Sequence, residues 1–214
     1  MRHLIFDLDG TISNPQQGIV NGYHYAFEKM GIPGKSESEL VGLIGPPLRV
    51  VFSEIYFFSK EDTDLAIQHY RDYYYGQGGM YENYIFEGMK DLLQELHAKN
   101  KLLHVATNKG LYVDKILDYL GVLEYFSSIE HYNEEKGVTQ KHQMISNILS
   151  FQNAEKERVL MIGDREHDIL AANQVGVQSI GVLYGFGSPE EMQKCRPTYV
   201  VSSVSELRDL LVEK

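Results

Sequence analysis

The chain has 214 residues, of which 43% are hydrophobic and 23% are charged, as expected for a globular protein of one or two domains. Lysine and arginine number 20 against 30 aspartates and glutamates, so the formal net charge is −10. A chain this acidic is a poor general ligand for nucleic acid polymers and anionic membranes, because its field repels both. If its ligand carries a phosphate, a local cation such as a metal or a lysine must attract it.

No stretch of the sequence approaches the length of a membrane span. The first apolar run breaks at Asp7, which is too early for the core of a signal peptide. Cys195 is the only cysteine, so no internal disulfide can form, and a reducing compartment is compatible with the sequence. We therefore expect a cytoplasmic protein with no membrane partner.

Short apolar runs bounded by polar turns predict buried strands, and apolar residues at helical spacing lie between them. The predicted strands cover residues 3–8, 102–106, 159–162, 177–183 and 199–201. Strands that alternate with helices indicate an α/β fold, a doubly wound and mostly parallel sheet with a Rossmann-like core.

Residues 14–85 differ, because they carry helical stripes and no convincing buried strand. We predict an inserted small α-helical cap domain over 14–85 and a core domain built from 1–13 and 86–214. Two chain crossings of this kind suit a hinged lid. The second half of the block is rich in tyrosine, which fits either packing of small helices or a surface facing a substrate or a second subunit. A monomer and a homodimer therefore both remain open.

Two aspartates follow the first predicted strand, in the motif Asp-Leu-Asp-Gly-Thr at residues 7–11. A strand end in an α/β sheet faces the ligand crevice, so we expect both carboxylates in one pocket. Asp7 is suited to attack phosphorus, and Asp9 to protonate a leaving oxygen and later to deprotonate water. Gly10 lets backbone N–H groups approach a phosphate closely. A plain Asp-Gly turn is the alternative, but such a turn does not require the first aspartate on a buried strand.

A second acidic pair, Asp164 and Asp168, follows the strand predicted at 159–162. If a helix begins here, the two residues share one of its faces, because they are four apart. Carboxylates at a strand end near Asp7 would suit a hard cation, and Mg²⁺ fits best, since it keeps waters and bridges to phosphate oxygens. Acidic capping of a helix N-terminus is the alternative.

Further segments supply polar and basic groups. Thr107 and Asn108 follow a predicted strand and could donate to phosphate oxygens, although both are also ordinary helix N-caps. Lys141 falls in the first turn of a predicted helix, where a cation opposes the macrodipole unless a phosphate or carboxylates lie nearby. A solvated lysine is the alternative, and Lys136 is close enough to be a rival. Arg49, in the helical block, could bind a substrate carboxylate bidentately or lie on the surface.

In this order and at this spacing, these segments resemble the motif set of the haloacid dehalogenase superfamily. The resemblance covers essentially the whole chain. The helical block, together with residues 44–48 and 180–188, resembles the phosphoglycolate phosphatase-like branch.

The resemblance implies a role for each matching residue. Asp7 would be the nucleophile and a Mg²⁺ ligand, and Asp9 the general acid/base, with its backbone carbonyl also on the metal. Asp164 would be the third protein ligand of the metal, and Asp168 would support its water shell. The groups implied for binding the phosphoryl group are Thr107, Asn108 and Lys141.

The sequence thus predicts a Mg²⁺-dependent phosphatase that hydrolyses a small phosphomonoester through an aspartyl-phosphate on Asp7. Phosphoglycolate is the first expected substrate and a nucleoside monophosphate the next. The alternatives are a sugar-phosphate mutase of the same superfamily and a non-catalytic phospholigand-binding protein. Haloacid dehalogenation is disfavoured, because Asp9 supplies an acid/base that a dehalogenase does not need.

Overall fold

The computed structural model describes residues 1–212, and the chain forms two compact units. The core unit joins Met1–Asn14 to the part of the chain from Ile85 onward, and the cap unit spans Pro15–Tyr84. The boundaries predicted from the sequence lie one residue earlier at the first crossing and one residue later at the second. None of the described helices is long and apolar enough to cross a membrane.

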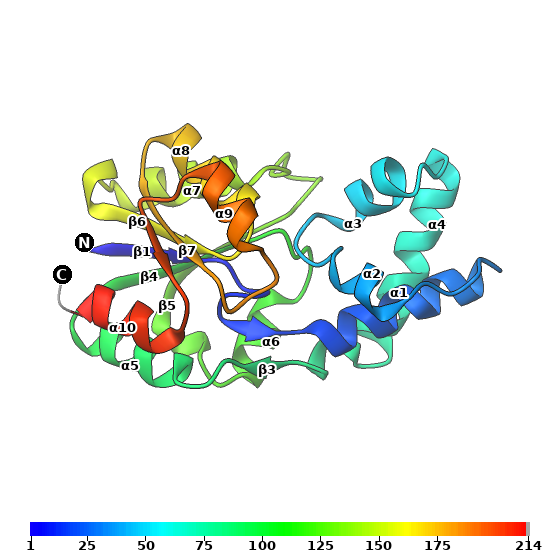
Figure 1. Ribbon diagram of the computed structural model, residues 1–214, viewed down its shortest axis with the longest axis horizontal. Helices are drawn as coiled ribbons and strands as arrows, with labels where there is room; N and C mark the ends of the chain where they lie inside the picture. The colour runs from blue at the N-terminus through cyan, green and yellow to red at the C-terminus, as the bar shows by residue number, and fades with distance from the viewer. Residues whose placement is uncertain (213–214) are drawn as a thin grey trace. The chain divides into compact units, whose positions relative to one another are not determined.

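The core unit is built on a six-stranded sheet in the order β5-β4-β1-β6-β7-β8, and every strand pair in it is parallel (Figure 1). The strands are β1 (His3–Phe6), β4 (Leu102–Thr107), β5 (Phe126–His131), β6 (Val159–Gly163), β7 (Gln178–Val182) and β8 (Tyr199–Val201). The prediction of a mostly parallel α/β sheet is confirmed.

The edge strand β5 is missing from the strands predicted from the sequence. It reads Phe-Ser-Ser-Ile-Glu-His and is mostly half-buried, so it has no apolar run to reveal it. The two short strands β2 (Ser13–Asn14) and β3 (Tyr84–Ile85), which pair where the chain passes between the units, were also not predicted.

Helices cover both faces of the sheet in the core unit, with α7 and α8 on one face and α5 and α10 on the other (Figure 1). The core helices are α5 (Met89–Ala98), α6 (Val113–Tyr119), α7 (Lys141–Gln152), α8 (Glu166–Val175), α9 (Pro189–Cys195) and α10 (Val204–Val212). Two short 3₁₀ turns, Leu123–Tyr125 and Lys156–Arg158, precede β5 and β6.

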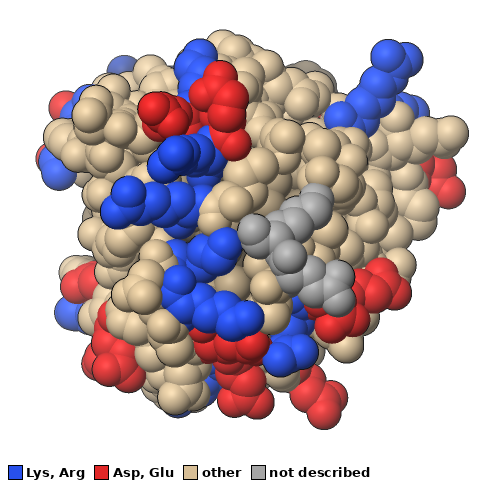
Figure 2. Space-filling model, turned by 90° about the vertical axis from the view of Figure 1, so that its left-hand side faces the viewer, with Lys and Arg blue, Asp and Glu red and all other residues tan. Residues whose placement is uncertain are grey.

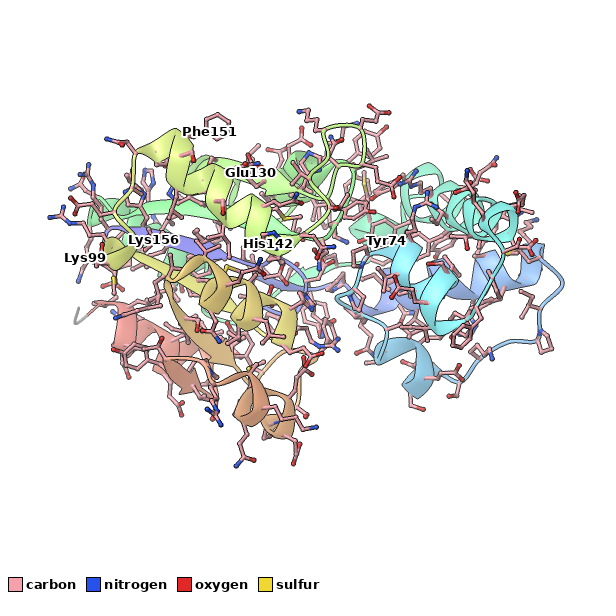
Figure 3. All side chains as sticks on the ribbon, turned by 90° about the horizontal axis from the view of Figure 1, so that it is seen from above. Tyr74, Lys99, Glu130, His142, Phe151 and Lys156 are labelled. Carbon is pink, nitrogen blue, oxygen red and sulfur yellow. The ribbon has the colours of Figure 1, made fainter. Side chains whose placement is uncertain are left out.

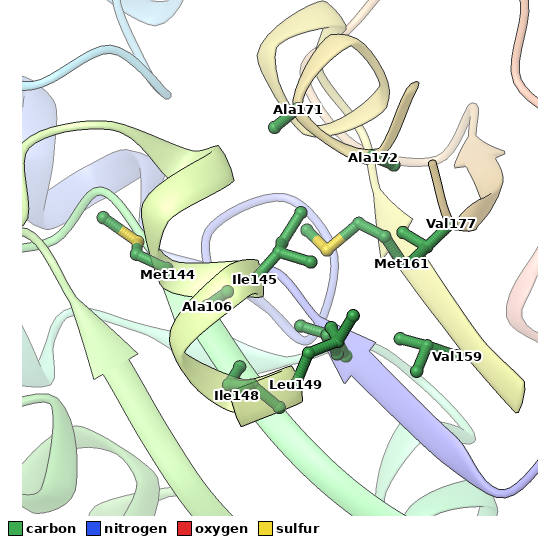
Figure 4. Close-up of a cluster of buried hydrophobic side chains, with 11 residues drawn as sticks. Ala106, Met144, Ile145, Ile148, Leu149, Val159, Met161, Ala171, Ala172 and Val177 are labelled. Carbon is green, nitrogen blue, oxygen red and sulfur yellow. The ribbon is translucent and has the colours of Figure 1, made fainter. Parts of the chain in front are cut away.

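A buried hydrophobic cluster holds α7 and α8 against the sheet (Figure 4). Ile145 and Ile148 of α7 and Ala172 of α8 pack with Met161 and Ile5 of the strands, and each is at most 1% exposed. Burying an aliphatic side chain of this size contributes about 1.5–3 kcal/mol. The cluster therefore packs α7 and α8 against β1 and β6.

Basic residues flank the end of the sheet at which its parallel strands begin. The backbone N–H of Arg2 donates to the carbonyl of Arg158, and the N–H of Leu102 donates to the carbonyl of Arg2, so β6, β1 and β4 start side by side. Figure 2 views this side and shows lysine and arginine side chains in a band, although the chain is acidic overall. Because the strands are parallel, the carboxylates that follow them lie at the opposite end of the sheet from this basic band.

The cap unit is helical and packed around aromatic rings. Its helices are α1 (Gln16–Lys29), α2 (Glu37–Val41), α3 (Leu48–Val50) and α4 (Lys60–Arg71), with π-helical segments at Val51–Ile55 and Asp72–Gly76 and a 3₁₀ turn at Gly79–Tyr81. Tyr23 lies 5.2 Å from Tyr70 between ring centroids, and Phe27 lies 5.1 Å from Tyr56. Tyr70 and Tyr74 are buried, as the packing interpretation expects, whereas Tyr84 is 61% exposed.

Candidate active site

Asp7 and Lys141 form a buried ion pair at the carboxyl end of β1. Lys141 Nζ lies 2.7 Å from Asp7 Oδ1, 2.9 Å from Asp168 Oδ1 and 2.8 Å from the carbonyl oxygen of Ala106. The Asp7 N–H donates to Ile162 O at 2.9 Å, which continues the β1–β6 ladder and fixes its backbone. Burial would lower the pKa of Lys141, but Asp168 and Asp7 outweigh that effect and raise it, so the ammonium stays charged.

The carboxylates of Asp7 and Asp168 explain why a lysine lies in the first turn of α7, where the helix dipole disfavours a positive charge. Lys141 is 4% exposed, whereas Lys136 is exposed in the preceding loop, where its backbone N–H donates to Asn133 Oδ1 at 3.0 Å. The structure thus brings Lys141, and not Lys136, to Asp7.

Asp9 lies in the loop after β1 and pairs with a lysine from the loop after β4. Lys109 Nζ is 2.9 Å from Asp9 Oδ2, and both side chains are largely buried. Asp9 Oδ1 is buried and has no hydrogen-bond partner among residues 1–212. Burial raises the pKa of Asp9, and the charge of Asp7 adds to this, while Lys109 opposes it. A carboxyl group with a raised pKa is suited to donate a proton and take it back.

Gly10 brings the Asp7–Asp9 loop against Asp164. Its φ is +88°, and a side chain at this position would collide with the Asp164 carboxylate and with the Phe186 ring. Asp164 Oδ2 accepts a hydrogen bond of 2.7 Å from the Phe186 N–H, and Oδ1 accepts one of 3.3 Å from Thr11 Oγ1. Burial raises the pKa of Asp164 well above its usual value, and Asp7 and Asp168 raise it further.

Asp168 and His167 come from the first turn of α8. Asp168 is fully buried, and its Oδ2 accepts a hydrogen bond from the Arg165 N–H at 3.1 Å, so it caps the helix as well as pairing with Lys141. His167 Nε2 lies 3.8 Å from Asp168 Oδ1. Burial and the neighbouring Lys141 lower the pKa of His167 to about 3, so the ring is neutral.

The remaining predicted site residues lie in different places. Thr107 ends β4 and is buried, and its Oγ1 accepts a hydrogen bond of 3.2 Å from the Lys109 N–H. Asn108 follows it and is half-buried. Arg49 belongs to the cap unit, where its guanidinium donates to Asp64 Oδ1 at 2.9 Å.

Three residues of this arrangement were not proposed as site residues from the sequence. Lys109 is next to Thr107 and Asn108 in the strand-end motif, but nothing local shows that it pairs with Asp9. Thr11 ends the first motif and donates to Asp164. His167 lies between the two predicted acidic residues and is half-buried at the first turn of α8.

The charges at the carboxyl edge fit a divalent cation. Four carboxylates face two ammonium groups, so full ionisation leaves two more negative charges than positive ones. Burial raises the pKa of Asp7 as well, against the opposing charge of Lys141. Clustered carboxylate oxygens are the ligands that Mg²⁺ prefers in proteins.

Comparison with known proteins places the chain in a family. A family model described as haloacid dehalogenase-like hydrolase matches residues 4–182. A 5′-nucleotidase from Pseudomonas aeruginosa is 35% identical over 98% of this chain and 95% of its own length. Tyrosine-protein kinase PtkA from Mycobacterium tuberculosis is 29% identical over 97% of this chain and 72% of its own length. A phosphoglycolate phosphatase from Vibrio parahaemolyticus is 26% identical over 97% and 95% of the two chains.

A solved structure agrees with these relatives. The crystal structure of a predicted phosphatase from Clostridium acetobutylicum is 35% identical, has a TM-score of 0.94 and covers 100% of this chain and 99% of its own. The resemblance found in the motifs is confirmed by both the family model and the fold: the chain belongs to the haloacid dehalogenase-like hydrolases.

Proposed function

We propose that the protein is a Mg²⁺-dependent phosphatase that hydrolyses small phosphomonoesters through an aspartyl-phosphate on Asp7. The observation that carries this proposal is the Lys141 ammonium held between Asp7 and Asp168 at the end of β1, with the loop bearing Asp9 directly beyond. Membership of a hydrolase family whose relatives include named phosphatases supports a small phosphate ester as substrate.

The residues can carry out both halves of the reaction. An Asp7 carboxylate oxygen attacks phosphorus while the bond from phosphorus to the ester oxygen breaks, and protonated Asp9 gives its proton to the leaving alcohol. A water molecule then attacks the aspartyl-phosphate, Asp9 takes up its proton, and Asp7 is regenerated as inorganic phosphate leaves. The raised pKa of Asp9 favours the protonated form that the first half needs.

Binding and orientation come from fixed groups around Asp7. We propose that Lys141, Thr107 and the loop at Gly10 bind the phosphoryl oxygens, with Asn108 beside them. The groups proposed to hold Mg²⁺ are the carboxylates of Asp7 and Asp164 and the backbone carbonyl of Asp9, and Asp168 would support its water shell. When bound, Mg²⁺ would offset the negative charge of the substrate and of the carboxylates that it meets.

The sequence relatives support two substrate classes. The 35% identity to a 5′-nucleotidase favours nucleoside 5′-monophosphates, and the 26% identity to a phosphoglycolate phosphatase keeps phosphoglycolate as the next candidate. This order reverses the one drawn from the motifs. Arg49 remains a proposed substrate contact, and it would have to leave its ion pair with Asp64 to bind a carboxylate or phosphate.

A substrate panel with matched variants tests the proposal. Phosphate release is measured from nucleoside monophosphates, phosphoglycolate and sugar phosphates, with Mg²⁺ and with EDTA. We expect release only with Mg²⁺, no release by Asp7→Asn, and a ³²P label on wild-type protein that is stable in acid and lost in base. Absence of release across the panel, or full activity in Asp7→Asn, would overturn the proposal.

A further inference from the structure

Tyr184 is a half-buried residue in the loop between β7 and α9, and the proposed reaction gives it no role. Its hydroxyl donates a hydrogen bond of 3.1 Å to the carbonyl oxygen of Thr11, which lies 173 positions earlier in the chain. Thr11 ends the motif that carries Asp7 and Asp9. Tyr184 therefore ties the loop after β7 to the loop that bears the proposed general acid.

The loop after β1 is anchored to other parts of the core unit at two of its carbonyl oxygens. Inside the loop, three backbone N–H groups donate to the carbonyl oxygen of Leu8, and these bonds determine its local shape. The carbonyl oxygen of Thr11 accepts from the Tyr184 hydroxyl, as described above. The carbonyl oxygen of Ile12 accepts from the Phe86 N–H at 3.2 Å. The rings of Tyr184 and Phe86 pack edge to face with centroids 5.1 Å apart, so the two anchors support each other.

Thr11 extends this constraint to the carboxylate of Asp164. Its Oγ1 donates to Asp164 Oδ1 at 3.3 Å, and the Phe186 N–H donates to Oδ2 at 2.7 Å. Phe186 is two residues after Tyr184, and Gly185 between them lies so close to Asp164 that an added Cβ would collide with its side chain. The loop after β7 thus holds one carboxylate oxygen of Asp164 directly and the other through Thr11.

We propose that Tyr184 is a positioning residue, whose hydroxyl fixes Thr11 and, through Thr11, the orientation of the Asp164 carboxylate. The inference rests on the proposed function for the role of Asp164 as a ligand of the divalent cation. Groups that orient metal ligands in this way typically contribute about 10–100-fold in metal affinity or activity. Lys141 and Thr107, which are proposed to bind the phosphoryl group, are held by contacts that do not involve Tyr184, so substrate binding should change little.

Calorimetric titration of the full-length protein with Mg²⁺ tests this role without relying on turnover. We expect Tyr184→Phe, which keeps the ring and removes the hydroxyl, to weaken Mg²⁺ binding about tenfold. Tyr73→Phe is the matched control, because the half-buried Tyr73 hydroxyl donates to Glu82 Oε1 within the cap unit. Tyr73 directly precedes Tyr74, which is labelled in Figure 3. The control should bind Mg²⁺ with the wild-type affinity.

A double-variant cycle tests whether Tyr184 acts through Thr11. Thr11→Val keeps the shape of the side chain, removes the hydroxyl that donates to Asp164, and should also weaken Mg²⁺ binding about tenfold. If the two residues act in series, the double variant should bind Mg²⁺ about as tightly as Thr11→Val does. Independent residues would instead multiply their losses to about 100-fold, and that result would overturn the proposal.

Steady-state kinetics separate positioning from packing. In Tyr184→Phe we expect kcat to fall about tenfold with little change in KM and with an unchanged near-ultraviolet circular dichroism spectrum. A residue needed only for packing would lower the unfolding free energy and leave Mg²⁺ affinity and kcat at their wild-type values, which would overturn this inference alone. Failure of wild type to bind Mg²⁺ would overturn the proposed function instead.

Discussion

Lys141 Nζ lies 2.7 Å from Asp7 Oδ1, although the two residues are 134 positions apart in the chain. The pair joins the end of β1 to the first turn of α7, and Asp168 brings α8 to the same ammonium at 2.9 Å. β1, α7 and α8 thus meet at one buried ammonium group. This group positions the proposed nucleophile, so substitutions that remove it should affect both activity and stability.

Lys141→Met should abolish activity and also destabilise the fold. Removing the ammonium leaves Asp7 and Asp168 buried without their cation, and breaking a buried pair from one side costs about 3–5 kcal/mol. We expect phosphate release to fall at least 100-fold, because one lost electrostatic contact to the reacting group is worth about 10²–10³. Lys136→Met is the control, and equal losses in both variants would show that the contact with Asp7 is not what matters.

Gly10→Ala should be far more harmful than the same change at another glycine with positive φ. Gly10 has φ +88° and its added methyl group would meet the Asp164 carboxylate, whereas Gly31 has φ +67° and open space around it. Both substitutions share the backbone strain of about 1 kcal/mol. Urea unfolding should therefore show an additional loss of about 1–3 kcal/mol for Gly10→Ala. Equal unfolding free energies would contradict the close approach of Gly10 to Asp164.

The sequence revealed the parts of the structure that depend on local patterns. Buried strands such as β1 and β6 are continuous apolar runs, and the aspartates that follow them lie at the same edge of a parallel sheet. The edge strand β5 was not predicted, because three of its six residues are serine or glutamate and its pairing with β4 is not visible in the local sequence.

Pairings between distant segments were harder to predict than the motifs themselves. The choice between Lys141 and Lys136 depends on how α7 packs, since both lysines lie near the start of that helix. The pair of Lys109 and Asp9 joins the loops after β4 and β1, and neither segment of sequence carries a pattern that predicts the other as its partner. The position of His167 beside Asp168 likewise follows from the packing of α8.

Divalent cation should stabilise the protein through Asp164. Burial raises the pKa of Asp7 and Asp164, and neighbouring carboxylates raise both further, so a bound cation relieves the cost of ionising this cluster at neutral pH. At 100 times its dissociation constant, Mg²⁺ should add about 2.7 kcal/mol to the unfolding free energy. Thermal unfolding with and without EDTA measures the effect. Asp164→Asn should retain little of it, and an undiminished shift in that variant would argue against Asp164 as a ligand.

Acid should destabilise the core through His104, which lies on β4 away from the proposed site. His104 is fully buried, and its ring nitrogens contact His3 at 3.2 Å and Ser128 at 2.8 Å. Burial and His3 lower the pKa of His104 to about 4 from its usual 6.5. The unfolded chain therefore binds a proton that the folded protein does not, so stability is complete above pH 6.5 and falls as the pH drops toward 4.

The expected loss is about 3 kcal/mol over that range, from about 1.4 kcal/mol for each pKa unit. Urea unfolding at pH 7.5, 6.0 and 5.0 measures it, and His104→Gln should show a shallower dependence on pH than wild type. His167 and the clustered carboxylates also contribute to the pH dependence of stability, but both proteins retain these groups, so the difference between the two slopes excludes them. His97→Gln, on the neighbouring helix α5, is the control and should keep the wild-type slope. Parallel slopes for wild type and His104→Gln would show that His104 is not buried in its neutral form.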